Sequence, residues 1–274
     1  MDEDIMIYLS MLMALQNEHF FWQAMDACGP LLGAEIFAFA YDETDIRKTR
    51  SALRRLKDHP LTFHGPMRGT ELTSAAGTRA LADTLDAFRR ALALAQEAGA
   101  GTMVVHTHER HIQPHEKSAL MRQCEENILA LAQIAQPCGV TLCIENVSLP
   151  HKGAALFDEA EYIALIRRLA PCRALIDVGH ACLTGWSLST LLHQLGGRIS
   201  GYHLHNNDGQ NDLHAWINCG TMNMNSVLSE IYKYDDNPAL VLEYDNARGH
   251  GLDELLTDIG QIRRSQPKGE STSR

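Results

Sequence analysis

Positive charge is scarce in this sequence. The 274 residues hold 24 Lys and Arg against 34 Asp and Glu, which gives a formal net charge of −10 at pH 7. Binding to nucleic acid depends on basic side chains gathered against the phosphate backbone. The charge balance therefore argues against a general nucleic-acid binder and leaves open only a local basic patch.

Paired cysteines are missing as well. The seven cysteines form no CxxC motif and are scattered along the chain, several of them inside apolar runs such as TLCIENV. An odd number of cysteines without a framework is typical of reduced, buried thiols in a cytoplasmic protein. We therefore expect free thiols and a cytoplasmic location.

Other signals of class are absent too. The amino-terminal run MDEDIMIYLSMLM is acidic and too short to span a bilayer, so we expect neither a targeting segment nor a membrane partner. No glycine-rich fingerprint follows the first strand-like segment, which argues against an open dinucleotide-binding sheet. The lack of repeats, linkers and low-complexity segments favours one domain over residues 1–264, with a disordered polar tail over 265–274.

What the sequence does contain is a regular alternation of strand-like and helix-like segments. The expected strands are 5–13, 34–40, 61–64, 102–106, 140–145, 174–177, 199–204 and 239–243. The expected helices are 18–32, 45–57, 76–98, 118–136, 159–169, 188–195, 225–234 and 252–263. Eight near-continuous apolar strands, each followed by a helix, predict an α/β fold of the (β/α)₈ TIM-barrel type.

Polar residues close the apolar strands. Five of the expected strands end in a histidine or a carboxylate, and a histidine directly follows a sixth: His64, His106, Glu145, Asp177 and Glu243, with His205 after the strand 199–204 and His180 three residues after Asp177. The strand ends of a barrel converge on the face that holds its active site. A single strand-end histidine is more often a hydrogen-bonded structural residue, but six such ends are improbable by chance. Because imidazole and carboxylate groups bind divalent metals, the pattern predicts a metal site.

The segment Ile199–His214, ISGYHLHNNDGQNDLH, is the richest in such residues. A short strand runs into a polar loop that also carries Asp212 and His214. Such a cluster is either part of a metal site or a polar loop with hydrogen-bonded histidines. His203 lies on the same side of the strand as His205 because side chains alternate, so it is either a site residue or a histidine of the barrel core.

Six motifs carry a resemblance to a known superfamily: FHGP, VVHTH, CIENV, LIDVGHA, HLHNNDGQNDLH and LVLEYDN. Together they resemble the xylose-isomerase-like barrels over the chain from about Leu31 to Asp258. That superfamily includes sugar and sugar-phosphate isomerases and epimerases, and also DNA-repair enzymes of the endonuclease IV type. The resemblance implies an enzyme of this fold without choosing between its members.

The epimerase-like members imply one divalent ion, usually manganese, cobalt or magnesium. Its four ligands match Glu145, Asp177, His205 and Glu243. In this reading Glu145 and Glu243 are also catalytic, because one removes a proton from the carbon beside a carbonyl and the other returns it on the opposite face. His180 would contact the substrate.

The endonuclease-like members imply three zinc ions and nine ligands. The chain matches all nine, since His64, His106, His180, Asp212 and His214 join the four above. The acidic composition and the bland segment MRGTELTS after His64 depart from the DNA-repair members. Loops of small-molecule members also resemble HNNDGxxDxH, so nine ligands do not by themselves indicate DNA.

Two residues near the motifs are candidate substrate contacts. Arg248 could bind an anionic group, and Trp186 could form a wall of a sugar pocket, although core packing explains a tryptophan equally well. The sequence thus favours a metal-dependent isomerase or epimerase of a carbohydrate-like small molecule, with one ion expected and up to three accommodated. The alternatives are a multi-zinc phosphoesterase and a barrel that only binds a ligand. Association with further copies of the chain is left open.

Overall fold

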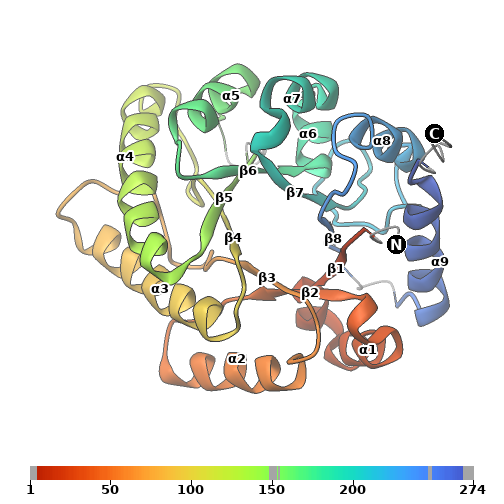
Figure 1. Cartoon of the computed structure of the whole chain (residues 1–274). Helices are drawn as coiled ribbons and strands as arrows, with labels where there is room; N and C mark the ends of the chain where they lie inside the picture. Colours follow the sequence, from red (N-terminus) through yellow and green to blue (C-terminus); the bar gives the residue numbers. More distant parts are fainter. Residues whose placement is uncertain (1–4, 148–152, 154, 246–248, 268–274) are drawn as a thin grey trace, which may run out of the picture.

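The computed structural model describes residues 5–147, 153, 155–245 and 249–267, and it shows eight parallel strands closed into a barrel (Figure 1). Neighbouring strands follow chain order, and the pairing of Ile7 with Leu240 closes the ring between the first and the last. The strands are β1 (Ile7–Ser10), β2 (Gly33–Phe37), β3 (Leu61–His64), β4 (Thr102–Val105), β5 (Thr141–Glu145), β6 (Arg173–Asp177), β7 (Ile199–Leu204) and β8 (Leu240–Leu242). The predicted (β/α)₈ barrel is confirmed.

Helices surround the strands on all sides in Figure 1. Polar residues cap the amino termini of several helices. The Asp42 side chain accepts hydrogen bonds from backbone amides in the first turn of α2, and Asp158 and Glu161 form a reciprocal capping box at the start of α5. Within the described residues the α-helices are α1 (Leu12–Cys28), α2 (Glu43–Arg55), α3 (Arg79–Glu97), α4 (Lys117–Ala135), α5 (Glu159–Arg168), α6 (Val178–Thr184), α7 (Leu188–Leu195), α8 (Met224–Ile231) and α9 (Leu252–Ser265).

The inward-facing residues of the barrel change from apolar to polar along β5 and β6. Val104, Cys143 and Leu175 form a small buried cluster of their own, separate from the large core between strands and helices. Two residues further along β5 and β6 come Glu145 and Asp177, which point to the same side because strand side chains alternate. The apolar layer thus forms the floor of the polar end of the barrel.

The prediction that one helix follows each strand is wrong after β6. A helix of seven residues, α6 (Val178–Thr184), comes between β6 and the predicted helix α7. The segment VGHACLT is too short to show an amphipathic repeat, and its capping residue, Asp177, is also the last residue of the strand. The sequence pattern marks the end of the strand at Asp177 but gives no sign of the additional helix that begins there.

The amino-terminal strand is shorter than predicted. β1 covers only Ile7–Ser10 of the expected segment 5–13, and α1 begins at Leu12, whose amide donates a hydrogen bond to the Ser10 hydroxyl at 3.3 Å. At Asn17 the helix leaves helical geometry, and the Asn17 side chain caps the following turn by accepting from the amide of Phe20 at 3.0 Å. The predicted helix 18–32 therefore begins at this internal cap, whereas α1 begins at Leu12.

Three further expectations concern the chain as a whole. All seven cysteines are free thiols. No helix of the described part of the chain has the length and apolar character needed to cross a membrane. The polar tail predicted from residue 265 begins with the last residue of α9, Ser265, and its part from 268 onward lies outside the described residues.

Candidate metal centre

Nine side chains from six strand ends meet at one end of the barrel. Three of them are the last residues of β3, β5 and β6, three directly follow β4, β7 and β8, one lies in α6, and two lie in the loop after β7. They are the nine predicted metal ligands: His64, Glu145 and Asp177, then His106, His205 and Glu243, then His180, and last Asp212 and His214. The structure thus brings together every predicted ligand from strands that are distant in sequence.

The first group of ligands forms around Glu145, whose side chain is 1% exposed. Its Oε2 atom lies 3.0 Å from His106 Nε2 and 3.6 Å from His64 Nε2. Both rings are fixed by their other nitrogen, since His64 Nδ1 contacts the Gly65 carbonyl at 3.0 Å and His106 Nδ1 contacts the Glu109 carboxylate at 2.6 Å. A histidine bound in this way through Nδ1–H presents the electron pair of Nε2 to the centre.

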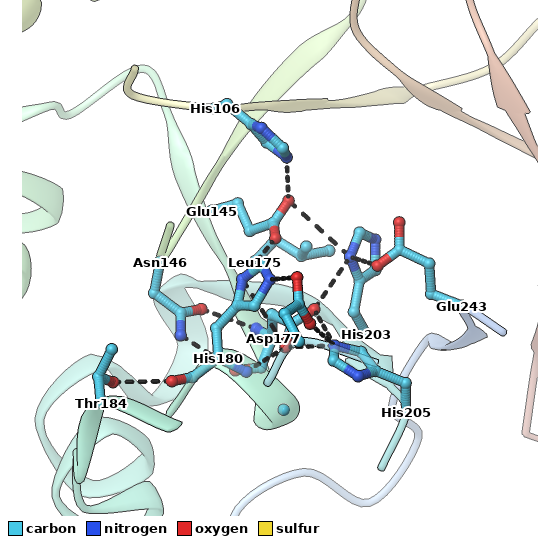
Figure 2. A network of polar contacts seen from close by, with 12 residues as sticks. His106, Glu145, Asn146, Leu175, Asp177, His180, Thr184, His203, His205 and Glu243 are labelled. Carbon is cyan, nitrogen blue, oxygen red and sulfur yellow. Dashed lines mark hydrogen bonds and ion pairs between the residues drawn. The ribbon is translucent and has the colours of Figure 1, made fainter. Parts of the chain in front are cut away.

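The central group contains Asp177, His205 and Glu243. His205 Nε2 lies 3.0 Å from both carboxylate oxygens of Asp177, and both side chains are fully buried. The side chain of Asn146 holds Asp177 in place, because it accepts from the Asp177 amide at 2.7 Å and donates to its carbonyl at 3.0 Å (Figure 2). The end of β5 therefore fixes the position of the carboxylate at the end of β6.

A third group lies nearer the surface. Asp212 Oδ2 is 3.3 Å from His214 Nε2 and 3.4 Å from His180 Nε2. His214 Nδ1 contacts the carbonyl oxygen of Glu243 at 3.0 Å, and its ring stacks on that of His205. His214 has a φ of 43°, a left-handed conformation that no other non-glycine residue shows within the described part of the chain. This unfavourable backbone conformation turns the ring toward Asp212.

Mutual attraction of opposite charges holds the cluster together in the absence of metal. Burial opposes ionisation of Glu145, but His106, His180 and His64 outweigh it and hold the pKa of Glu145 well below its ordinary value. Burial likewise opposes the charged form of His106, yet the carboxylates of Glu145 and Glu109 raise its pKa to about 9. A proton on His106 thus balances part of the carboxylate charge, and a bound cation would take over that role and release the proton.

The donor atoms fit divalent cations. Nitrogen and oxygen atoms from separate residues lie within 4.8 Å of one another in several overlapping groups, among them His64–His106–Glu145, Asp177–His205–Glu243 and His180–His205–Asp212–His214. Buried atoms of four of these residues lack a hydrogen-bond partner: Glu145 Oε2, His180 Nδ1, His205 Nδ1 and Asp212 Oδ1. Such atoms are costly to bury without a partner, and ligation would satisfy donors of this kind.

Of the three predicted substrate contacts, His180 lies in this cluster and Trp186 lies apart from it. The described ring contact of Trp186 is with Tyr162, whose hydroxyl donates to carbonyls of β5 and β6. Trp186 therefore packs on the outside of the barrel wall, as the core-packing alternative predicts. Arg248 lies outside the described residues.

Three residues that contact the cluster escaped the sequence analysis: Glu35, Glu109 and Asn146. Glu109 follows His106 by three residues in a loop that holds several other polar side chains, so the sequence alone does not mark Glu109 as a contact of the cluster. Glu35 gave a clearer signal, because it is a charged residue in the middle of the buried strand β2. A carboxylate at such a position requires a partner inside the barrel.

Comparison with known sequences agrees with this geometry. Residues 22–265 match the sequence model of the family described as Xylose isomerase-like TIM barrel. Uncharacterized protein MJ1614 of Methanocaldococcus jannaschii is 25% identical over 207 residues, which span 76% of this chain and 79% of that protein.

Three solved structures resemble the barrel over nearly its whole length. A D-tagatose 3-epimerase-like protein has a TM-score of 0.72 at 19% identity and covers 95% of this chain and 98% of its own. An IOLI protein with a bound zinc atom has a TM-score of 0.75 at 14% identity, with 95% and 96% covered. An AP endonuclease of family 2 from Brucella melitensis has a TM-score of 0.73 at 17% identity, with 93% and 98% covered. At these identities the likeness establishes the shared fold.

Proposed function

We propose that this chain, which belongs to the xylose isomerase-like TIM barrel family, is a divalent-metal-dependent isomerase or epimerase of a sugar or sugar-like compound. The observation that carries the proposal is a pair of buried glutamates facing one small space. Glu145 and Glu243 come from the ends of β5 and β8, and their Oε2 atoms lie 3.9 Å and 3.1 Å from the same nitrogen, His203 Nδ1 (Figure 2). Two carboxylates so placed can serve opposite faces of one substrate carbon.

The residues divide the proposed reaction between them. Asp177, His205 and the two glutamates would hold a divalent ion, which supplies polarisation of the substrate carbonyl when bound. Burial opposes ionisation of Glu243, but His203 and His214 outweigh it and lower its pKa, as His106 and its neighbours do for Glu145. Both glutamates are therefore ionised and able to accept a proton. One would remove the proton beside the carbonyl, and the other would return one on the opposite face.

The structural neighbours support a sugar-like substrate and a bound metal. A D-tagatose 3-epimerase-like protein shares the barrel, and an IOLI protein of the same shape carries a zinc atom. The side chains of Glu145 and Glu243 are 1% and 5% exposed, so a substrate bound between them would exclude water from the proton transfer.

The first test is proton exchange. Protein loaded in parallel with manganese, cobalt, magnesium or zinc is incubated in D₂O with a panel of ketoses and ketose phosphates. We expect deuterium to replace the proton beside the carbonyl of at least one compound, about 10²-fold or more above the chelator-treated protein. Proton NMR measures the lost signal and any epimer formed. Exchange at the chelator-treated level across the panel, with bound metal demonstrated, would refute the proposal.

A multi-zinc phosphoesterase is the second candidate. The group formed by His180, Asp212 and His214 favours it, because a single ion held at the strand ends has no need of these ligands. The AP endonuclease of Brucella melitensis shares the fold.

Binding and cleavage of duplex DNA distinguish the isomerase or epimerase from the phosphoesterase. At physiological salt we expect binding weaker than a Kd of about 10⁻⁴ M, the weak limit of ordinary non-specific binding, because the chain carries a formal charge of −10. Fluorescence anisotropy of a labelled duplex with an abasic site measures this, with an intact duplex as the control. Nicking of the abasic duplex at an enzyme-like rate, abolished by chelator, would favour the phosphoesterase.

A further inference from the structure

Beneath the proposed ligands, two ionisable side chains pair in the interior of the barrel. His203 on β7 and Glu35 on β2 are both 0% exposed, and His203 Nε2 contacts Glu35 Oε2 at 3.1 Å with hydrogen-bond geometry. β2 and β7 are not neighbours in the sheet, so the pair spans the barrel. Two buried ionisable groups are costly to the fold unless their charges and hydrogen bonds are matched.

The other nitrogen of the His203 ring lies among the carboxylates of the site. His203 Nδ1 is 3.1 Å from Glu243, 3.7 Å from Asp177 and 3.9 Å from Glu145 (Figure 2). Despite these distances it makes no hydrogen bond of acceptable geometry with any of them. The nitrogen therefore points into the space between three oxygens instead of at one of them.

The protonation of the ring follows from its partners. A carboxylate only accepts hydrogen bonds, so Nε2 carries the proton that Glu35 accepts, and Nδ1 is the nitrogen that would give up its proton and offer its electron pair when a cation binds among the carboxylates. An electron pair between three carboxylates is repelled unless a cation lies among them. His64 and His214 show the same arrangement with the ring reversed, since each is bound through Nδ1 and presents Nε2 to the cluster.

We propose that His203 Nδ1 is a further ligand of the ion held by Asp177, His205, Glu145 and Glu243, and that Glu35 positions it by accepting the Nε2 proton. This proposal rests on the metal dependence proposed above. Glu35, His203 and Glu243 also have donor atoms within 4.8 Å of one another, and this group shares Glu243 with the four ligands above. A carboxylate behind a ligating histidine fixes the tautomer and raises the basicity of the ligand.

A second imidazole also affects which metal the site prefers. Imidazole suits zinc and cobalt, whereas carboxylate and water suit manganese and magnesium. His203 would therefore favour cobalt and zinc, and its loss would cost more affinity for these ions than for manganese.

The test measures metal affinity without any substrate. Wild type, His203→Gln and Glu35→Gln are stripped with chelator and titrated with Co²⁺ or Mn²⁺ in competition with a chromophoric chelator, and the visible spectrum of bound Co²⁺ reports its ligands. We expect both variants to bind Co²⁺ about 10–100-fold more weakly than wild type, with a changed Co²⁺ spectrum for His203→Gln. His108→Gln is the control, because His108 is equally buried but belongs to none of the metal-holding groups found in the described residues.

The possible outcomes distinguish a failure of the metal-dependent function from a failure of the role proposed for His203. A wild type that takes up neither ion refutes the metal-dependent function and the role of His203 together. A wild type that binds Co²⁺, with affinity and spectrum unchanged in both variants, refutes the role of His203 alone. Equal losses for Co²⁺ and Mn²⁺ would show that the ring only positions its neighbours. If the melting temperature shows that stripped His203→Gln does not fold, Glu35→Gln decides by the same comparison.

Discussion

The Glu145→Gln variant is expected to lose about 10²–10⁴-fold in the rate of proton exchange with its substrate, the usual contribution of a placed acid or base. Glutamine keeps the shape of the side chain but cannot accept a proton. Glu145 also contacts His64, His106 and His180, so the substitution weakens the cation-binding group as well. Deuterium exchange at saturating metal separates the loss of the base from the loss of the ion.

Glu243→Gln is expected to show a loss of the same order for the same reason. Its carboxylate contacts two histidines, His203 at 3.1 Å and His214 at 3.5 Å. If the two glutamates act on opposite faces, each variant loses the proton transfer on the face that its glutamate serves. Turnover in both directions between two epimers should therefore be abolished by either substitution.

The matched control is Glu126→Gln on the exposed side of α4, far from the barrel end. It should leave exchange unchanged, and all three variants should remain folded, as judged by their melting temperatures, because each substitution preserves shape. Full exchange activity in either Glu145→Gln or Glu243→Gln would end the paired-glutamate mechanism.

The number of metal ions bound per chain is the second property for which we expect a large effect of substitution. We expect the protein to retain at least one ion on Glu145, Asp177, His205 and Glu243, and to take up more ions weakly through the remaining ligands. An unsatisfied buried polar group costs roughly 1–3 kcal/mol, and among the five remaining ligands His180 Nδ1 and Asp212 Oδ1 lack a hydrogen-bond partner that a cation would replace. Asp212→Ala with His214→Ala should lower the metal content under excess zinc by one ion per chain.

Elemental analysis after dialysis, and again under excess zinc or manganese, measures this change. Gln210→Ala in the same loop is the control, because the described contact of Gln210 is made by its backbone amide and its side chain is exposed. A wild type with a single ion, unchanged in the double variant under excess metal, would assign Asp212 and His214 to the substrate instead.

The positions of the strand-end residues could be predicted because a local pattern determines them. An apolar strand that ends in His64 or Glu145 shows its end in the sequence, and a parallel barrel brings all such ends to one face. The loop pair Asp212 and His214 was recognisable by its motif. The left-handed backbone of His214 was not, since only contacts made after folding require it.

Pairing across the barrel could not be predicted. Glu35 and His203 are 168 residues apart, and alternation shows only that each faces inward. Which inward side chains meet depends on strand tilt and closure, and no local pattern records either. For this reason the sequence allows His203 to be either a site residue or a core histidine.

Asp177 also connects the site to the local stability of α6. Its Oδ1 atom accepts the amide of His180 at 2.7 Å and lies 3.0 Å from His205 Nε2, so one carboxylate both begins the helix and faces the cluster. Gly179, in the first turn of α6, packs so closely on the His205 ring that a Cβ there would collide with it. A helix of seven residues is marginal by itself. Opening of α6 would therefore withdraw His180 and uncover His205 in a single event, so that the lifetime of the assembled site cannot exceed the lifetime of this short helix.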